Sequence, residues 1–144
     1  ENIAYLFQFD GEMTEAEFLK KVLERTGCGW LLDVTNVYAN AINFGYDADE
    51  FIEEVMPAAD AVQIHLAGGY WDEKAEMYID SHSHPIPKDV FRLYRRSLEL
   101  AGDKCNAVFI ERDQNFPDEA GWRGEARQVR EIAEEIYSPA LSAH

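Results

Sequence analysis

Three short apolar runs constrain the fold of this chain more than any other feature of its sequence. They occupy residues 30–34, 61–66 and 107–111, and each is almost continuous in strand-forming side chains. Such runs are typical of strands that are buried in a parallel sheet. Helical patterns lie between the runs, and this alternation favours an α/β fold that is built from βαβ units.

Four segments have the apolar spacing of an amphipathic helix. They cover residues 14–25, 47–55, 87–101 and 125–137. The first begins with a capping box of Thr14 and Glu17, and Gly27 follows it as a stop signal. Right-handed crossovers would place these helices in one outer layer if the sheet closes into a barrel. Residues 67–87 are expected to form a long loop, and such loops are often functional.

At or next to its end, each apolar run has a side chain that can bind a metal ion. These side chains are Asp33, His65 and Glu111. Because parallel strands end at the same rim of a sheet, we expect the three to lie close together. Gln63 shares a face of its strand with His65, and that face should point away from the helices. A set of carboxylates and imidazoles without thiolate suits iron, manganese or zinc, and argues against a structural zinc site.

Further candidate ligands lie outside these runs. Asp80 and His82 form an Asp-x-His pair in the long loop, and such a pair places both side chains on one side of an extended segment. Asn36 lies three residues beyond Asp33, and Glu1 opens the chain. His84, which precedes a proline, is not expected to be a ligand.

Each candidate also has an ordinary structural interpretation. Asp33 could cap the turn after its strand, and His65 could be a hydrogen-bonded core histidine. Glu111 could form an ion pair at the rim with Arg112, and the Asp-x-His pair could make loop hydrogen bonds. The joint pattern is harder to explain in this way, because three successive strands end in ligand-type residues.

The charge of the chain limits its partners. It has 144 residues with 28 acidic and 13 basic side chains, a formal net charge of −15, which disfavours nucleic-acid binding. No segment approaches the roughly 20 apolar residues of a membrane span, so we expect no membrane contact. Cys28 and Cys105 lie beside apolar runs, and we expect both to be packing residues in a reducing, cytoplasmic compartment.

Five stretches of the sequence resemble the multinuclear non-haem iron-dependent oxidase family, which includes the oxidase of methanobactin biosynthesis. They are residues 1–6, 31–38, 63–68, 79–82 and 110–113. The resemblance implies a xylose-isomerase-like TIM (β/α)₈ barrel, with this chain covering roughly the end of strand five through strand eight. Residues 1–144 would then be the C-terminal part of a single barrel domain. Because a typical barrel has about 250 residues, an N-terminal half of about 100 residues or more would be absent from the chain.

The resemblance also implies a site with two or three iron ions, although zinc or manganese remain alternatives. Glu1 matches a bridging carboxylate, and Asp33, His65 and Glu111 match further ligands of the catalytic pair. Asn36, Asp80 and His82 match residues around another metal position. Related abasic-site endonucleases have a histidine at the position of Asn36, which counts against a nuclease.

The function that the resemblance implies is an O₂-dependent oxidation of cysteine residues in a ribosomally synthesised precursor peptide. A small partner protein could deliver the peptide. Arg112 and Asp113 would orient the ligands. Two alternatives stay open at this point: a divalent-metal-dependent hydrolase or sugar isomerase on the same barrel, and an inactive metal-binding fragment that is not an enzyme.

Overall fold

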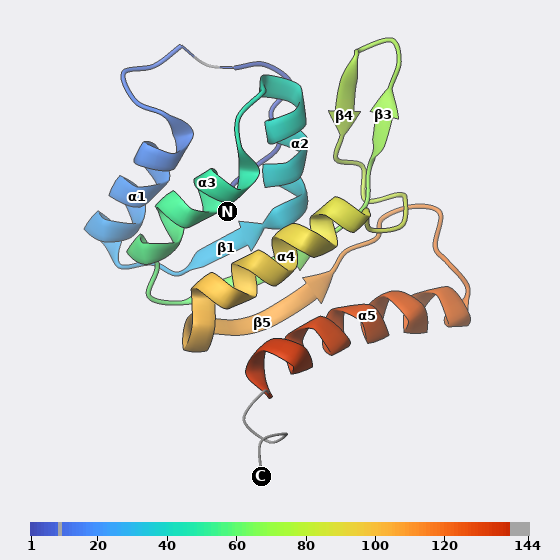
Figure 1. Cartoon of the computed structure of the whole chain (residues 1–144). Coiled ribbons are helices and arrows are strands. Elements are labelled where there is room, and N and C mark those ends of the chain that lie inside the picture. Colours follow the sequence, from blue (N-terminus) through green and yellow to red (C-terminus); the bar gives the residue numbers. More distant parts are fainter. Residues whose placement is uncertain (9, 139–144) are drawn as a thin grey trace.

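The three apolar runs form a parallel sheet, as predicted. The computed structural model describes residues 1–8 and 10–138, and within them β1 (Trp30–Asp33), β2 (Val62–Leu66) and β5 (Cys105–Ile110) pair in the order β1-β2-β5 (Figure 1). Asp33 lies opposite His65 in the register, and His65 lies opposite Phe109. The carboxyl ends of the strands therefore meet at one rim.

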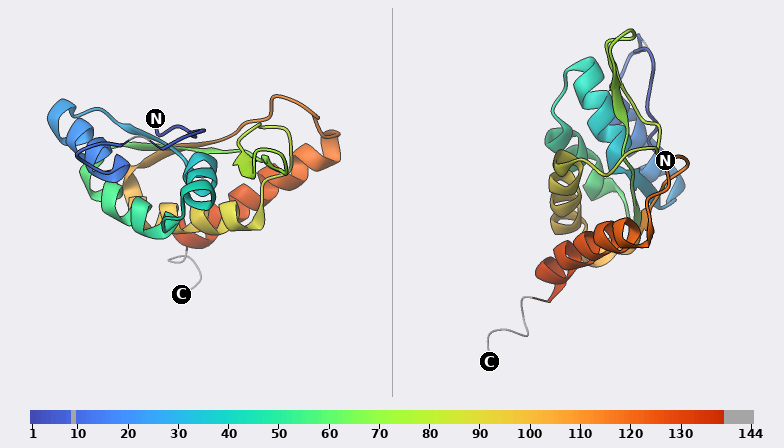
Figure 2. Two further views of the ribbon diagram at one scale, coloured as in Figure 1. Left: turned by 90° about the horizontal axis from the view of Figure 1, so that it is seen from above. Right: turned by 90° about the vertical axis from the view of Figure 1, so that its right-hand side faces the viewer.

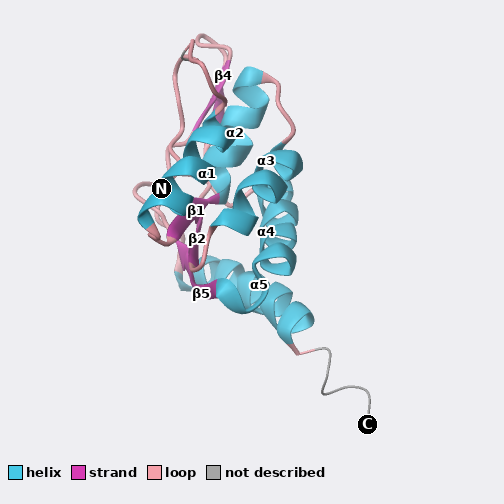
Figure 3. Cartoon of the chain, turned by 90° about the vertical axis from the view of Figure 1, so that its left-hand side faces the viewer, coloured by secondary structure: helices cyan, strands magenta, loops and turns pink. Residues whose placement is uncertain are grey.

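The helices form a curved layer on one side of this sheet (Figures 2 and 3). They are α1 (Glu15–Thr26), α2 (Val34–Phe44), α3 (Ala48–Val55), α4 (Lys88–Ala101) and α5 (Glu119–Tyr137), with short 3₁₀ helices at Met56–Ala58 and Gly102–Lys104. The capping box of Thr14 and Glu17 is present, and α5 begins at Glu119 rather than at residue 125. Leu32, Ile64 and Leu98 are among the fully buried side chains between the sheet and the helices.

Helix α2 was not among the predicted helices. Its sequence, VTNVYANAINF, is rich in β-branched and asparagine residues, which have low helix propensity. Its ends carry ordinary signals nevertheless, since Asp33 caps its start and Gly45 adopts the left-handed conformation at its end, with φ of 75°. Val34, predicted as the last strand residue, is instead the first residue of α2.

The predicted long loop contains a β-hairpin. Strands β3 (Tyr70–Asp72) and β4 (Met77–Ile79) pair antiparallel beside α2. The side-chain amide of Asn43 on α2 donates to the carbonyl of Tyr78 at 2.9 Å and accepts from its N–H at 2.7 Å. Tyr70 and Trp71 are exposed, whereas Tyr78 is buried and packs edge-on against Tyr38.

The face of the sheet opposite the helices is open. Exposure alternates along β2, so Gln63 and His65 lie on this face while Val62, Ile64 and Leu66 are buried, as predicted. Phe109 on the neighbouring strand is 45% exposed. The parallel sheet and its single helix layer are compatible with a fragment of a TIM-like barrel. Closure into a barrel, the range of strands and the domain assignment remain predictions.

The two cysteines lie near the amino ends of strands, away from the rim: Cys105 begins β5, and Cys28 precedes β1. Cys105 is half-buried at the start of β5, and burial raises the pKa of its thiol. Cys28, however, is exposed between α1 and β1, so its prediction as a packing residue was wrong. None of the helices in the described part of the chain is long and apolar enough to cross a membrane.

Candidate metal centre

The carboxyl ends of the strands bring the predicted ligands together. Asp33 ends β1, His65 is the penultimate residue of β2, and Glu111 follows β5 directly. The Glu111 N–H donates to the carbonyl of Leu66 at 2.9 Å, which continues the sheet to this point. His65 Nδ1 lies 3.2 Å from Glu111 Oε1, without the geometry of a hydrogen bond.

Asp33 is the most deeply buried member of this cluster. Its side chain is the N-cap of α2 and accepts the N–H of Asn36 at 2.8 Å, so its structural and ligand roles coexist. The residue is 1% exposed. Burial raises the pKa of Asp33 to about 7; the charges of Asp80 and Glu1 add to the shift, while the Asn36 hydrogen bond and His82 oppose it. A carboxylate in this position is stabilised by a cation.

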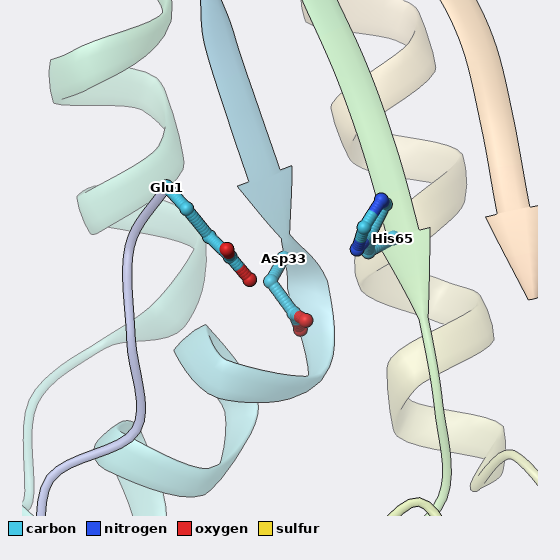
Figure 4. Close-up of side chains that lie close together, drawn as sticks. All are labelled: Glu1, Asp33 and His65. Atoms are coloured by element: carbon cyan, nitrogen blue, oxygen red, sulfur yellow. The ribbon is translucent and has the colours of Figure 1, made fainter. Parts of the chain in front are cut away.

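Asparagine side chains hold Glu1 beside β1. The amide of Asn2 donates to the carbonyl of Asp33 at 2.8 Å and accepts its N–H at 3.1 Å. Asn36 donates to the carbonyl of Asn2 at 3.1 Å, and Asn40 donates to the carbonyl of Ile3 at 2.8 Å. These contacts place Glu1 beside Asp33 and His65, and the three side chains lie close together (Figure 4). Each offers one ligand atom, and these atoms lie within 4.8 Å of one another.

A second group of possible ligands shares Asp33 with the first. It consists of Asp33, His82 and Glu111, whose ligand atoms again lie within 4.8 Å of one another. His82 Nε2 lies 3.0 Å from Asp80 Oδ2, and its Nδ1 lies 3.4 Å from Glu111 Oε2 and 3.3 Å from Asp113 Oδ2. A carboxylate on one imidazole nitrogen is the usual device that orients a histidine whose other nitrogen binds metal.

Asp80 and His82 contact each other, as the alternative of loop hydrogen bonds predicted. The segment after β4 is not extended at this point, because His82 has a φ of 51°, in the left-handed region. Residues held in this region cluster at functional sites. Burial lowers the pKa of His82, but the charge and hydrogen bond of Asp80, with further carboxylates, raise it above its usual value. Burial raises the pKa of Asp80, and His82 opposes this shift.

Unpartnered polar atoms show that the residues fit a metal ion. Asn36 Oδ1, His65 Nδ1 and Asp80 Oδ1 are buried in the described structure and have no hydrogen-bond partner. Buried polar atoms rarely stay unpaired, and all three can donate a lone pair to a cation. The donor set of carboxylate, imidazole and amide oxygen suits a first-row divalent metal rather than a thiolate-bound zinc.

The residues expected to orient the ligands behave differently from one another. Asp113 is 72% exposed beside His82. Arg112 turns away from the ligands and pairs with Glu125, a residue that the sequence did not single out. Arg112 therefore forms its ion pair with Glu125, and not with Glu111 as the ordinary structural interpretation of Glu111 expected. His84 contacts Ser83 and belongs to neither ligand group among the described residues.

Comparison with known proteins shows the family to which the chain belongs. A family model described as "RiPP precursor modification enzyme MbnB/TglH/ChrH" matches residues 1–134. The chain is 40% identical over 133 residues to a UPF0276 protein of Rhizorhabdus wittichii, covering 92% of the chain and 46% of that relative. It is 41% identical over 133 residues to a UPF0276 protein of Bordetella pertussis, covering 90% of the chain and 45% of that relative. It is 35% identical over 132 residues to a UPF0276 protein of Pseudomonas aeruginosa, covering 92% of the chain and 45% of that relative. The chain thus spans about half the length of these curated relatives.

Proposed function

Because this chain belongs to the RiPP precursor modification enzyme family MbnB/TglH/ChrH, we propose that it supplies part of the active site of a metal-dependent, peptide-modifying oxidase. The family agrees with the resemblance that the sequence motifs indicated. Since the chain spans about half of its curated relatives, the activity, substrate and partners of the whole protein are part of the proposal.

The observation that carries the proposal is the position of Asp33 in two ligand groups at one rim. Glu1, Asp33 and His65 would hold one metal ion, and Asp33, His82 and Glu111 would hold a second. A carboxylate has two oxygens, so a shared Asp33 can serve two neighbouring ions. Asn36 and Asp80 add the unpartnered oxygens that would complete or orient this set.

We propose iron as the metal, with zinc and manganese as the alternatives. When bound, iron supplies the redox chemistry for an O₂-dependent oxidation of a cysteine in a ribosomally synthesised precursor peptide. The protein ligands contain no sulfur, which leaves the substrate thiolate as the soft ligand. The capping bond from Asn36 and the Asp80 contact of His82 hold two of the ligands in fixed orientations before substrate arrives.

The β3–β4 hairpin is the part of the chain that we propose covers the rim. It follows β2 within a few residues and is fixed to α2 through Asn43. Its exposed Tyr70 and Trp71 offer aromatic surface for a peptide, and closure over the site would exclude water. We further propose that the chain is the C-terminal part of a barrel and that a small partner protein delivers the peptide.

The test is O₂ consumption by the complete protein after loading with Fe(II) in the absence of oxygen. We expect uptake that depends on a cysteine-containing precursor peptide, and none with the same peptide carrying serine, because the hydroxyl stays protonated and binds iron poorly. The zinc-loaded protein is the matched control and should consume no O₂. Equal O₂ uptake with the serine peptide would refute the role of the substrate thiolate. Peptide turnover by the zinc form without O₂ uptake would show that the reaction class is wrong and would favour a hydrolase or isomerase.

A further inference from the structure

A buried ion pair fastens helix α5 to the rim of the sheet. Arg112 Nη2 donates to both carboxylate oxygens of Glu125, each at 3.0 Å. The two side chains are 3% and 14% exposed, respectively. The Arg112 guanidinium also lies 6.0 Å from the ring centre of Trp122, on the same helix as Glu125. One nitrogen serves both carboxylate oxygens, and hydrogen bonds between charged groups of this kind are stronger than neutral ones.

Glu125 also holds a third segment. Its Oε1 accepts the N–H of Ile86 at 3.0 Å, and Ile86 closes the loop that begins with Asp80 after β4. One carboxylate thus connects α5, the residues after β5 and the loop that carries His82. We call the pair of Arg112 and Glu125 the α5 latch.

The α5 latch is connected to one of the two ligand groups. Arg112 directly follows Glu111 in the chain. The N–H of Asp113 donates to the carbonyl of His82 at 2.8 Å, and the Asn115 side chain donates to the carbonyl of Ser83 at 3.3 Å. Movement at Arg112 would therefore shift Glu111 and His82 together. The other group depends instead on β1, β2 and the asparagine contacts of α2.

The energetics of the pair of Arg112 and Glu125 also favour a role in positioning rather than in stability. A buried ion pair contributes little net stability, because the loss of hydration offsets the attraction between the charges. It does impose one arrangement, since removing either partner leaves a charge buried alone. We infer that Arg112 and Glu125 are positioning residues for the metal site formed by Asp33, His82 and Glu111, an inference that rests on the proposed metal-binding function.

A Mn²⁺ titration of the complete protein, followed by electron paramagnetic resonance, tests this inference. Glu125→Ala should weaken one bound Mn²⁺ equivalent by roughly 10- to 100-fold, as is usual when a group that orients metal ligands is lost, and leave another unchanged. Glu125→Gln should show a smaller loss, because its amide oxygen still accepts the N–H of Ile86. Glu135→Ala is the matched control: it removes the exposed pair with Arg95 between α4 and α5, and should change neither equivalent.

The outcomes separate the α5 latch from the metal centre itself. If the unchanged protein binds no Mn²⁺, the proposed metal centre fails. If it binds Mn²⁺ at two sites and Glu125→Ala retains both affinities, or loses both equally, the positioning role is refuted. Should Glu125→Ala not fold, Glu125→Gln decides the question: a native circular dichroism spectrum with one weakened equivalent supports the inference, and unchanged binding overturns it.

Discussion

Replacing Asp33 with asparagine should stabilise the metal-free protein at alkaline pH while weakening metal binding. Asparagine is as good an N-cap as aspartate, so its oxygen can still accept the N–H of Asn36 and begin α2. The substitution removes a charge that is buried among the carboxylates of Glu1 and Asp80. The buried charge of Asp33 destabilises the metal-free protein and is compensated only when a cation is bound.

The pKa of Asp33 sets the size and sign of the effect. Burial raises this pKa from 3.8 to about 7, so the folded protein holds a proton that the unfolded chain has released between these two pH values. The contribution of Asp33 to the stability of the metal-free protein therefore falls as pH rises from about 4 to 7. A difference of about 3 pKa units corresponds to about 4 kcal/mol, fully lost above the folded pKa.

The assay is urea unfolding of the chelator-treated complete protein between pH 4 and pH 8.5. Asp33→Asn should flatten the fall in unfolding free energy and gain up to about 4 kcal/mol at the alkaline end. Asp47→Asn, the same change at the exposed N-cap of α3, is the matched control and should not gain stability at the alkaline end, because it removes no buried charge. If Asp33→Asn were less stable than the natural protein at pH 8.5 with an unchanged slope, the charge of Asp33 would not be the cause of the pH dependence.

Three further predictions follow from the same geometry. Glu111→Ala should remove at least one metal equivalent and most turnover. It should change the free energy of unfolding by only about 1 kcal/mol or less, because the Glu111 side chain is 37% exposed. Full iron content in this variant would refute the ligand role of Glu111. Cys28→Ser and Cys105→Ser should keep near-normal O₂ consumption, because both lie at the strand ends opposite the rim; loss of turnover with a normal fold would reveal a redox role. The 144-residue chain alone should not be a stable active monomer, because its open sheet face and the edges of β1 and β5 would be exposed to water. A monomer in ultracentrifugation that unfolds cooperatively in calorimetry would contradict this.

The strands and the clustering of their last residues could be predicted from the sequence. The continuous apolar runs predicted the parallel strands, although β5 at the edge of the sheet is only half-buried. Strand direction alone brings Asp33, His65 and Glu111 to one rim. The alternation along β2 likewise fixes the face of His65. These are properties of neighbouring residues and of the handedness of the chain, so no knowledge of distant contacts is needed.

The remaining features depend on contacts between segments that are distant in sequence. Helix α2 has weak intrinsic propensity, and its asparagines bond to the N-terminal residues and to the hairpin, which lie more than 30 residues away in the chain. Asp33 followed by Asn36, with Gly45 as a stop, was the available signal for this helix. The pairing of Arg112 with Glu125 depends on how α5 packs, which the sequence pattern does not specify.

Mössbauer spectroscopy of the complete protein, loaded with ⁵⁷Fe(II) and partly oxidised, tests whether Asp33 holds two metal ions next to each other as a member of both ligand groups. We expect at least two iron ions per chain with a magnetically coupled signal, and loss of the coupling in Asp33→Asn. A single uncoupled iron, or an identical coupled spectrum in Asp33→Asn, would contradict this role of Asp33.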